Sequence, residues 1–208
     1  MKSAPDLVFQ ETMSGPLGLG SRSPEVGKRQ GRASPLSLHA TIRIDSMEDF
    51  LQDSEHAAWL GGHVSFPSFA EHLPILRGRF QLFSPSHEPR MRLMRYGALF
   101  AHEGREYWLS GTKYLRDDPG PDLWPDTTRL LTTLHEGHDA RGPVVGAGVL
   151  SIGVRGLLAL VASMRSPQGG VRELARFGRF FLGNLWDLYV HPPTLSLDDW
   201  LSPRGAGV

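Results

Sequence analysis

The chain has 208 residues, which is long enough for one well-filled hydrophobic core and short for two. Its 22 basic and 22 acidic residues cancel, so the formal net charge is zero and no overall electrostatic field favours binding to nucleic acid. The absence of Cys excludes disulfides, thiol nucleophiles and metal sites built from cysteine.

Residues 1–34 are rich in Gly, Ser and Pro and are predicted to form an extended N-terminal segment that lies over the surface. The first ten residues lack the apolar run of a signal peptide, which favours a cytoplasmic protein. The most apolar stretch, residues 144–164, is interrupted by Gly153, Arg155 and Gly156. We therefore expect no transmembrane segment.

From residue 36 onward apolar and polar residues alternate, as in β-strands whose two faces have different surroundings. Ser46 is expected to cap a short helix over residues 47–51, which has acidic residues in its first turn. The alternation and the turns between runs predict an antiparallel sheet or barrel over residues 35–165. Its strands are expected at residues 36–44, 63–66, 75–83, 91–101, 106–116, 127–135 and 144–154.

The alternation also predicts which side chains share the apolar face of the sheet. We expect a mainly β fold with C-terminal helices, a curved antiparallel sheet or β-barrel for which a lipocalin-like architecture is one option. The shared face is predicted to hold Leu76, Gly78, Phe80 and Leu82, then Met94, Tyr96, Ala98 and Phe100, then Tyr107, Leu109, Gly111, Lys113 and Leu115.

The last third of the chain changes to helical spacing. A short helix is predicted at residues 155–164, and residues 171–190 form the clearest helical pattern, within a C-terminal helix and tail over residues 166–208. Its apolar surface extends beyond one stripe, which is compatible with burial inside the domain, with docking of a partner protein or with contact to a membrane. The residues that widen this surface are Phe177, Phe180 and Trp186, beside a basic stripe of Arg172, Arg176 and Arg179.

Several strings of the sequence are distinctive. They are LPILRGRFQLF, MRLMRYGALF, YWLSGTKYLRDDPGPDLWPDTTRLLTTLHEG and RFGRFFLGNLWDLY, with the opening FQETMSGPLGLG. These strings resemble a module that is attached to the catalytic part of large bacterial glucose–methanol–choline oxidoreductases, flavin-type enzymes often labelled cholesterol-oxidase-like. The similarity covers nearly the whole chain, and it implies an association with lipid oxidation and with a flavin oxidoreductase as a partner.

A flavin domain itself is not expected. Such a domain holds the pyrophosphate with a strand, a G-x-G-x-x-G turn and a helix. The nearest string, residues 146–151, ends in Ser151 and has no convincing acidic partner downstream, so we interpret its glycines as structural. The chain then resembles the companion module alone, and we expect no cofactor and no redox chemistry.

Lys113 is the most informative single residue, because it is one of only three Lys and shares the apolar face with Tyr107, Gly111 and Leu115. A buried ammonium needs a partner or loses its proton. The functional interpretation is a pocket cation that binds a ligand carboxylate, or a reactive amine with a lowered pKa. The alternative is a strand end at which Lys113 extends to solvent or pairs with Asp117 or Asp118.

Two glycines on the apolar face suggest a cavity. Side chains are missing at Gly78 and Gly111, which leaves room for a ligand or instead marks bulges that curl the sheet. With Tyr96 and Tyr107 nearby, such a cavity is expected to be mostly apolar with a few polar groups, as small-molecule sites are.

Metal binding and serine chemistry are not favoured. The cluster of Asp117, Asp118, Asp122 and Asp126 does not have the spacing of an EF-hand loop and is typical of turns and helix caps. The spacing of His135 and His138 differs from that of a zinc H-E-x-x-H motif. No G-x-S-x-G elbow is present.

Three functions remain open. We expect a binding module for an apolar or amphiphilic small molecule, of sterol or fatty-acyl type, with ligand-binding residues Lys113, Tyr96, Tyr107, Gly111 and Gly78. One alternative is a flavin-free isomerase or cyclase that uses a Lys and Tyr pair for acid–base chemistry. The other is a structural module that docks a flavoprotein.

Overall fold

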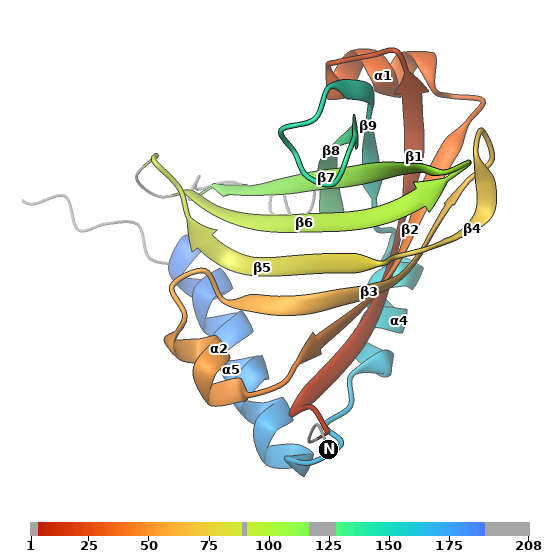
Figure 1. Cartoon of the computed structure of the whole chain (residues 1–208). Coiled ribbons are helices and arrows are strands. Elements are labelled where there is room, and N and C mark those ends of the chain that lie inside the picture. The colour runs from red at the N-terminus through yellow and green to blue at the C-terminus, as the bar shows by residue number, and fades with distance from the viewer. Residues whose placement is uncertain (1–3, 89–90, 117–127, 190–208) are drawn as a thin grey trace, which may run out of the picture.

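The computed structural model describes residues 4–88, 91–116 and 128–189 and has a mainly β fold with helices towards its C-terminal end (Figure 1). Eight antiparallel strands form a closed barrel, and β4 pairs with β3 outside the ring. In chain order the strands are β1 (Leu7–Leu19), β2 (Pro35–Ile44), β3 (Ala57–Phe66), β4 (Ala70–Pro74), β5 (Arg77–Pro85), β6 (Met91–His102), β7 (Arg105–Arg116), β8 (Arg129–Glu136) and β9 (Val144–Ser151).

The barrel closes because β2 pairs with both β1 and β3. Around the ring the order is β1, β2, β3, β5, β6, β7, β8 and β9, and β9 pairs with β1 again. An eight-stranded barrel has an interior just wide enough to be filled by side chains or to hold one small ligand. The predicted curved sheet or barrel is therefore confirmed in its closed form.

The predicted inward face is also confirmed for the central strands. In the β6–β7 pair Met94 lies opposite Lys113 and Tyr96 lies opposite Gly111, and all four are buried. Because side chains alternate across a strand, this register sends every second residue into the barrel. The exception is Leu76, which precedes β5 and has an exposed side chain.

The prediction that residues 1–34 lie over the surface is wrong, because this segment supplies a full barrel strand. β1 pairs with β2 over ten residues and also with β9, so it is needed for closure. A short helix, α1 (Pro24–Gln30), then packs over β1 and β9. The helix can approach β9 closely because Gly27 has no side chain: a Cβ there would collide with the carbonyl oxygen of Ala147. Gly148 serves the strand pair instead, since a Cβ on it would collide with the carbonyl oxygen of Pro16 on β1. The 146–151 string therefore lies in a strand rather than in a phosphate-binding turn.

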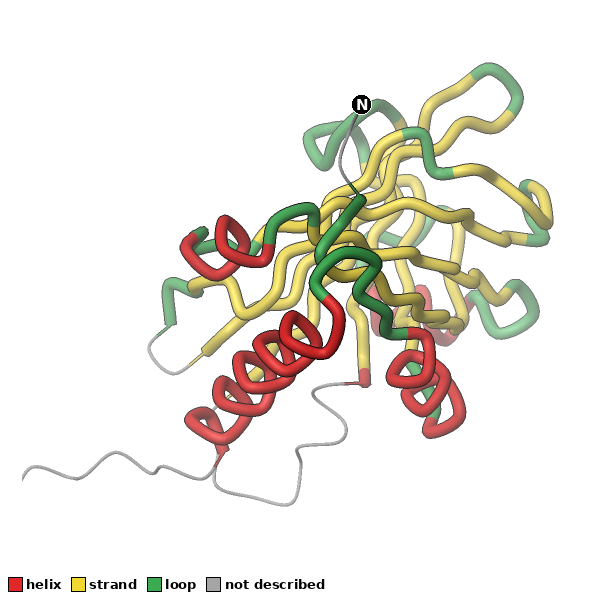
Figure 2. The backbone as a smooth tube through the Cα atoms, turned by 90° about the horizontal axis from the view of Figure 1, so that it is seen from below, coloured by secondary structure: helices red, strands yellow, loops and turns green. Residues whose placement is uncertain are grey.

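Three further helices lie near one end of the barrel. They are α2 (Met47–Gln52), α4 (Val154–Ser163) and α5 (Gly170–Tyr189). Figure 2 looks at the barrel from this end, with the long helix α5 at the lower left and α4 at the lower right. Ser46 caps α2 as predicted, since its hydroxyl accepts a hydrogen bond from the amide of Asp49 at 3.2 Å. The connection between α4 and α5 is tied to β1 by two backbone hydrogen bonds between Val8 and Arg165, each 2.9 Å long.

Aromatic side chains attach α5 to the barrel. Phe177 is buried and contacts Phe9 on β1, with ring centroids 5.8 Å apart. Phe180 contacts Phe50 of α2 and Phe83 of β5, each at 5.8 Å. The predicted burial of this helix within the domain is thus confirmed for Phe177, whereas the side chain of Trp186 lies outside the described residues.

The barrel interior has two different halves. At the end away from α5 it is filled by large side chains, among them Phe66 and Phe100, which have no exposed surface. Tyr107 completes this cluster through ring contacts with Phe69 and Phe100. At the end covered by α5 the interior is hollow, and the candidate site lies there.

Candidate ligand-binding site

A cavity of about 340 Å³ lies between the barrel interior and the helices α4 and α5. Strand residues such as Phe9, Phe80 and Met94 form one wall, and Met164, Phe177 and Phe181 form the other. Its volume lies in the range of small-molecule sites, about 300–1,000 Å³. The cavity is therefore large enough for a small ligand and is lined mainly by carbon.

Four polar side chains line this apolar cavity. Glu11 comes from β1, Tyr96 from β6 and Lys113 from β7, and Thr128 lies just before β8. The first three are closely coupled, because the charge of Glu11 acts on both Tyr96 and Lys113. A few convergent polar groups in an apolar pocket fix the orientation of a ligand.

Lys113 faces the interior, as predicted, and only 3% of its surface is exposed. Its ammonium lies over the ring of Tyr96, with Nζ 5.3 Å from the ring centroid. Burial lowers the pKa of this amine from its ordinary value, and the negative charge of Glu11 partly opposes the shift. The alternative in which Lys113 extends to solvent is therefore wrong.

Tyr96 keeps its proton more strongly than an ordinary phenol. Burial raises its pKa well above 10, and the charge of Glu11 and a hydrogen bond with that carboxylate raise it further. A phenol held in this state donates its O–H and does not ionise at neutral pH. Tyr96 is thus a hydrogen-bond donor next to a carboxylate.

Glu11 was missed by sequence reasoning, because it lies in the segment interpreted as a surface extension. It is 95% buried, since only 5% of its surface is exposed. A signal was present: Leu7, Phe9 and Met13 are spaced by even numbers of residues, as on one face of a strand, and Glu11 falls in the same register. Its Oε1 atom accepts no hydrogen bond from any described residue.

The other three predicted ligand-binding residues do not line this cavity. Tyr107 belongs to the filled half of the barrel. A Cβ on Gly111 would lie 2.7 Å from the Leu130 side chain, and one on Gly78 would collide with the carbonyl oxygen of Leu60. The space beside both glycines is therefore already occupied by neighbouring strands, and neither glycine creates a cavity.

The mouth of the cavity lies between α4 and α5. Val161 of α4 and Leu182 of α5 both line the cavity, yet they are 59% and 65% exposed. A side chain that touches both the cavity and solvent marks its opening. The mouth is thus rimmed by apolar side chains, and Leu158 on α4 adds another exposed one.

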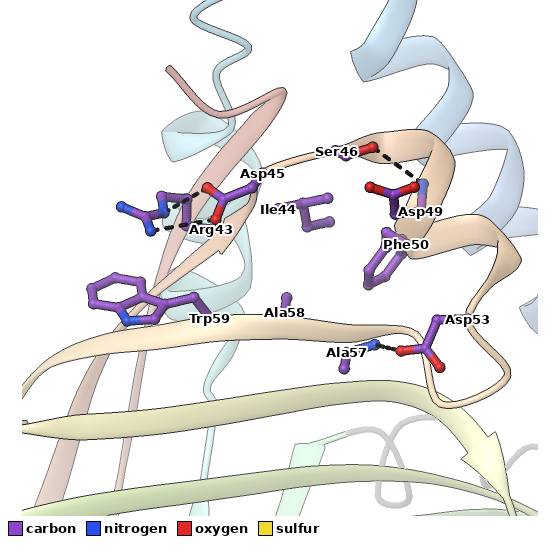
Figure 3. A pocket seen from close by; sticks show the side chains of 10 residues that line it. All are labelled: Arg43, Ile44, Asp45, Ser46, Asp49, Phe50, Asp53, Ala57, Ala58 and Trp59. Carbon is purple, nitrogen blue, oxygen red and sulfur yellow. Dashed lines mark hydrogen bonds and ion pairs between the residues drawn. The ribbon is translucent and has the colours of Figure 1, made fainter. Parts of the chain in front are cut away.

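A second hollow of about 330 Å³ lies on the outside of the barrel, where α2 meets β2 and β3 (Figure 3). Two of the three carboxylates that line it, those of Asp45 and Asp53, have partners in the fold. Asp45 pairs with Arg43 at 2.9 Å, and Asp53 accepts hydrogen bonds from the backbone amides of Ala57 and Glu55. These two amides lower the pKa of Asp53. We interpret this hollow as a structural turn rather than a site.

Four of the described histidines are engaged in structural contacts. His135 has one ring nitrogen 2.9 Å from the carbonyl oxygen of Gly142 and the other 3.0 Å from the hydroxyl of Thr133. Three others stack on the outer face of β2, β3 and β4, with centroids 4.3 Å apart for His39 and His63 and 4.1 Å for His63 and His72. Within the described residues no group of three or more His, Asp or Glu is placed to hold a metal ion. Asp117, Asp118, Asp122 and Asp126 lie outside the described residues.

Comparisons with known proteins add no family. No protein-family model, no curated protein and no solved structure matches the chain. Among the described residues, no helix is both long enough and apolar enough to cross a membrane.

Proposed function

We propose that the barrel is a binding module for an amphiphilic small molecule of sterol or fatty-acyl type, and that it performs no redox chemistry of its own. The apolar part of the ligand lies between the barrel wall and α5, and the polar head lies against Glu11, Tyr96 and Lys113. The observation that carries the proposal is the cavity itself, which is apolar except for a few converging polar groups.

The mouth supports an exchange of ligand with a lipid surface. Residues 152–184 hold five Arg and one Glu, a net charge of +4 in a chain whose formal charge is zero. On α5 the exposed Val171 and Leu182 form an apolar stripe, and Arg172 and Arg179 follow on the adjacent side of the helix. An apolar rim beside Arg fits the acyl and phosphate layers of an anionic membrane. A flavin oxidoreductase, as the resemblance implies, is the alternative partner for this surface.

A second candidate is catalysis without a flavin, as an isomerase or cyclase. Tyr96 and Lys113 share one cavity, and their pKa values are shifted in opposite directions. Such pairs are typical of acid–base sites. Recovery of a bound lipid chemically unchanged after long incubation supports binding alone, whereas a product that Tyr96→Phe fails to form supports catalysis.

The decisive experiment blocks the cavity from α5. Gly178 lines the cavity, and an added Cβ there meets no atom within 4 Å, so Gly178→Phe places a ring at the cavity wall without a backbone clash. Gly183 lies on the same helix with equal free space but does not line the cavity, so Gly183→Phe is the matched control. Both changes replace a helical glycine, and their effects on helix propensity cancel in the comparison.

Native mass spectrometry of freshly purified protein is the readout. We expect a co-purifying lipid in the wild type and in Gly183→Phe. In Gly178→Phe the ring occupies space that the ligand would fill, so the ligand loses apolar contacts and its occupancy should fall at least about tenfold. Equal occupancy in the two variants, or none in the wild type even after incubation with amphiphiles, contradicts the proposal.

A further inference from the structure

The buried carboxylate in the cavity has an unused acceptor. Glu11 is 95% buried, and no described residue donates a hydrogen bond to its Oε1 atom. Buried polar atoms are nearly always hydrogen-bonded, because leaving one unsatisfied costs the desolvation free energy of that group. Since Glu11 lines the cavity, the missing donor belongs to whatever occupies the cavity.

The neighbouring groups limit the charge of that occupant. The nearest cation in the cavity, Lys113, already has the negative charge of Glu11 acting on it. A ligand carboxylate would therefore bring a second anion next to Glu11, and a ligand amine would bring a second cation next to Lys113. Like charges in a poorly solvated site repel strongly, so both are disfavoured.

A neutral head group with a donor meets both conditions. A water molecule in the cavity can satisfy Oε1, and a ligand that displaces it loses affinity unless it makes the same hydrogen bond. An alcohol does so, because its O–H donates to the carboxylate while its oxygen accepts from an ammonium. An ether has the oxygen but no hydrogen to donate.

We propose that the cavity selects an uncharged amphiphile with a hydroxyl head group, whose O–H donates to Oε1 of Glu11 and whose oxygen faces the ammonium of Lys113. This inference rests on the proposed binding function and narrows it from amphiphiles in general to alcohols. It also replaces the expectation of an anionic ligand, because the protein supplies the anion itself.

The test uses three probes with the same chain: 1-decanol, methyl decyl ether and decanoate. Their affinities for the full chain are measured by displacement of a bound apolar fluorophore. We expect 1-decanol to bind about tenfold or more tightly than the ether, the usual effect of one hydrogen bond to a charged group, and more tightly than decanoate. An ether that binds as well as the alcohol, or decanoate that binds best, overturns the inference.

A variant inverts the expected order. In Glu11→Gln the anion is removed while Lys113 stays, so decanoate should gain at least about tenfold and overtake 1-decanol. Glu48→Gln, which changes an exposed carboxylate on α2, is the control and should leave the wild-type order unchanged. If Glu11→Gln does not fold, the order of the three probes on the wild type still decides.

Failure of this inference is distinguishable from failure of the proposed function. If all three probes bind equally well and Gly178→Phe weakens the binding of each, the cavity binds amphiphiles but does not select those with a hydroxyl group. If none of the three probes binds the wild type, the binding function itself is wrong.

Discussion

Replacing Lys113 with Met removes a charge that the fold holds in its interior. The substitution keeps an unbranched apolar chain of similar length, but it leaves the buried carboxylate of Glu11 without the cation that acts on it. Breaking a buried ion pair typically costs about 3–5 kcal/mol. No carboxylate of a described residue forms an ion pair within 4.0 Å of Nζ, so we expect the low end, about 3 kcal/mol at pH 7. For a chain of this size the corresponding fall in Tm is about 6–12 °C.

Urea unfolding followed by tryptophan fluorescence measures this loss, provided that the m-value is unchanged. Lys28→Met is the matched control, because Lys28 is exposed on α1 and its replacement should change stability by no more than about 0.5 kcal/mol. The double variant Lys113→Met/Glu11→Met should be as stable as the wild type or more so, since apolar residues can replace a buried pair without loss. The coupling energy in this cycle is the sum of the two single losses minus the loss in the double variant, so it should be at least about 3 kcal/mol.

Two results would refute the reasoning. In the first, Lys113→Met behaves like Lys28→Met, which means that the ammonium is solvated. In the second, the double variant loses the sum of the two single losses, which means that Glu11 and Lys113 act independently. The pH dependence gives a further check: because the folded pKa of Lys113 lies below 10.5, the unfolded chain binds the extra proton, and the wild type should gain stability relative to Lys113→Met as pH rises towards 10.5.

Three other measurements test the electrostatics. The lowered pKa values of His39 and His63 mean that the fold favours neutral rings, so stability should be lost as pH falls from about 6.5, and His63→Gln should weaken that loss in acid unfolding curves. The raised pKa of Tyr96 predicts that stability falls as pH rises above 10. Because Tyr96 does not ionise near pH 10 in the folded protein, ultraviolet titration should count the same number of ionising phenols there in native Tyr96→Phe as in the wild type. Vesicles with anionic phospholipid should co-sediment with the protein, and Leu182→Glu should reduce that binding at least about tenfold by placing a carboxylate on the apolar rim.

The alternation of apolar residues was sufficient to predict most of the barrel. It identified the inner face of β5, β6 and β7, including the position of Lys113, because buried and mostly apolar residues recur at every second position of these strands. It failed for β1, where Gly15 and Pro16 gave the segment the composition of a loop. Proline has no backbone N–H to donate and therefore weakens a strand in the middle of a sheet. Pro16 is tolerated because it lies opposite Pro35, the first residue of β2, where the pairing of β1 with β2 ends.

The candidate site was predictable only in part. Tyr96 and Lys113 follow from the strand pattern, but their third partner, Glu11, comes from a strand far away in sequence and required the closure between β1 and its neighbours. The two glycines misled for a different reason. A missing side chain leaves a void only if no neighbour fills it, and Leu60 and Leu130 fill the space beside Gly78 and Gly111. That packing depends on the shape of the closed barrel, which a linear pattern does not contain.

The two halves of the interior contribute differently to stability. The filled half holds Phe66, Phe100 and Leu134 without exposed surface, so it can stabilise the closed ring independently of what occupies the other end. In the hollow half the charged residues Glu11 and Lys113 stand where apolar side chains could pack, and this lowers stability relative to hydrophobic packing of the same volume. A fold that already has a sufficient core tolerates that loss. Substitutions in the cavity should consequently alter ligand preference while the barrel remains folded, and this makes Glu11 and Lys113 suitable positions for a test of function.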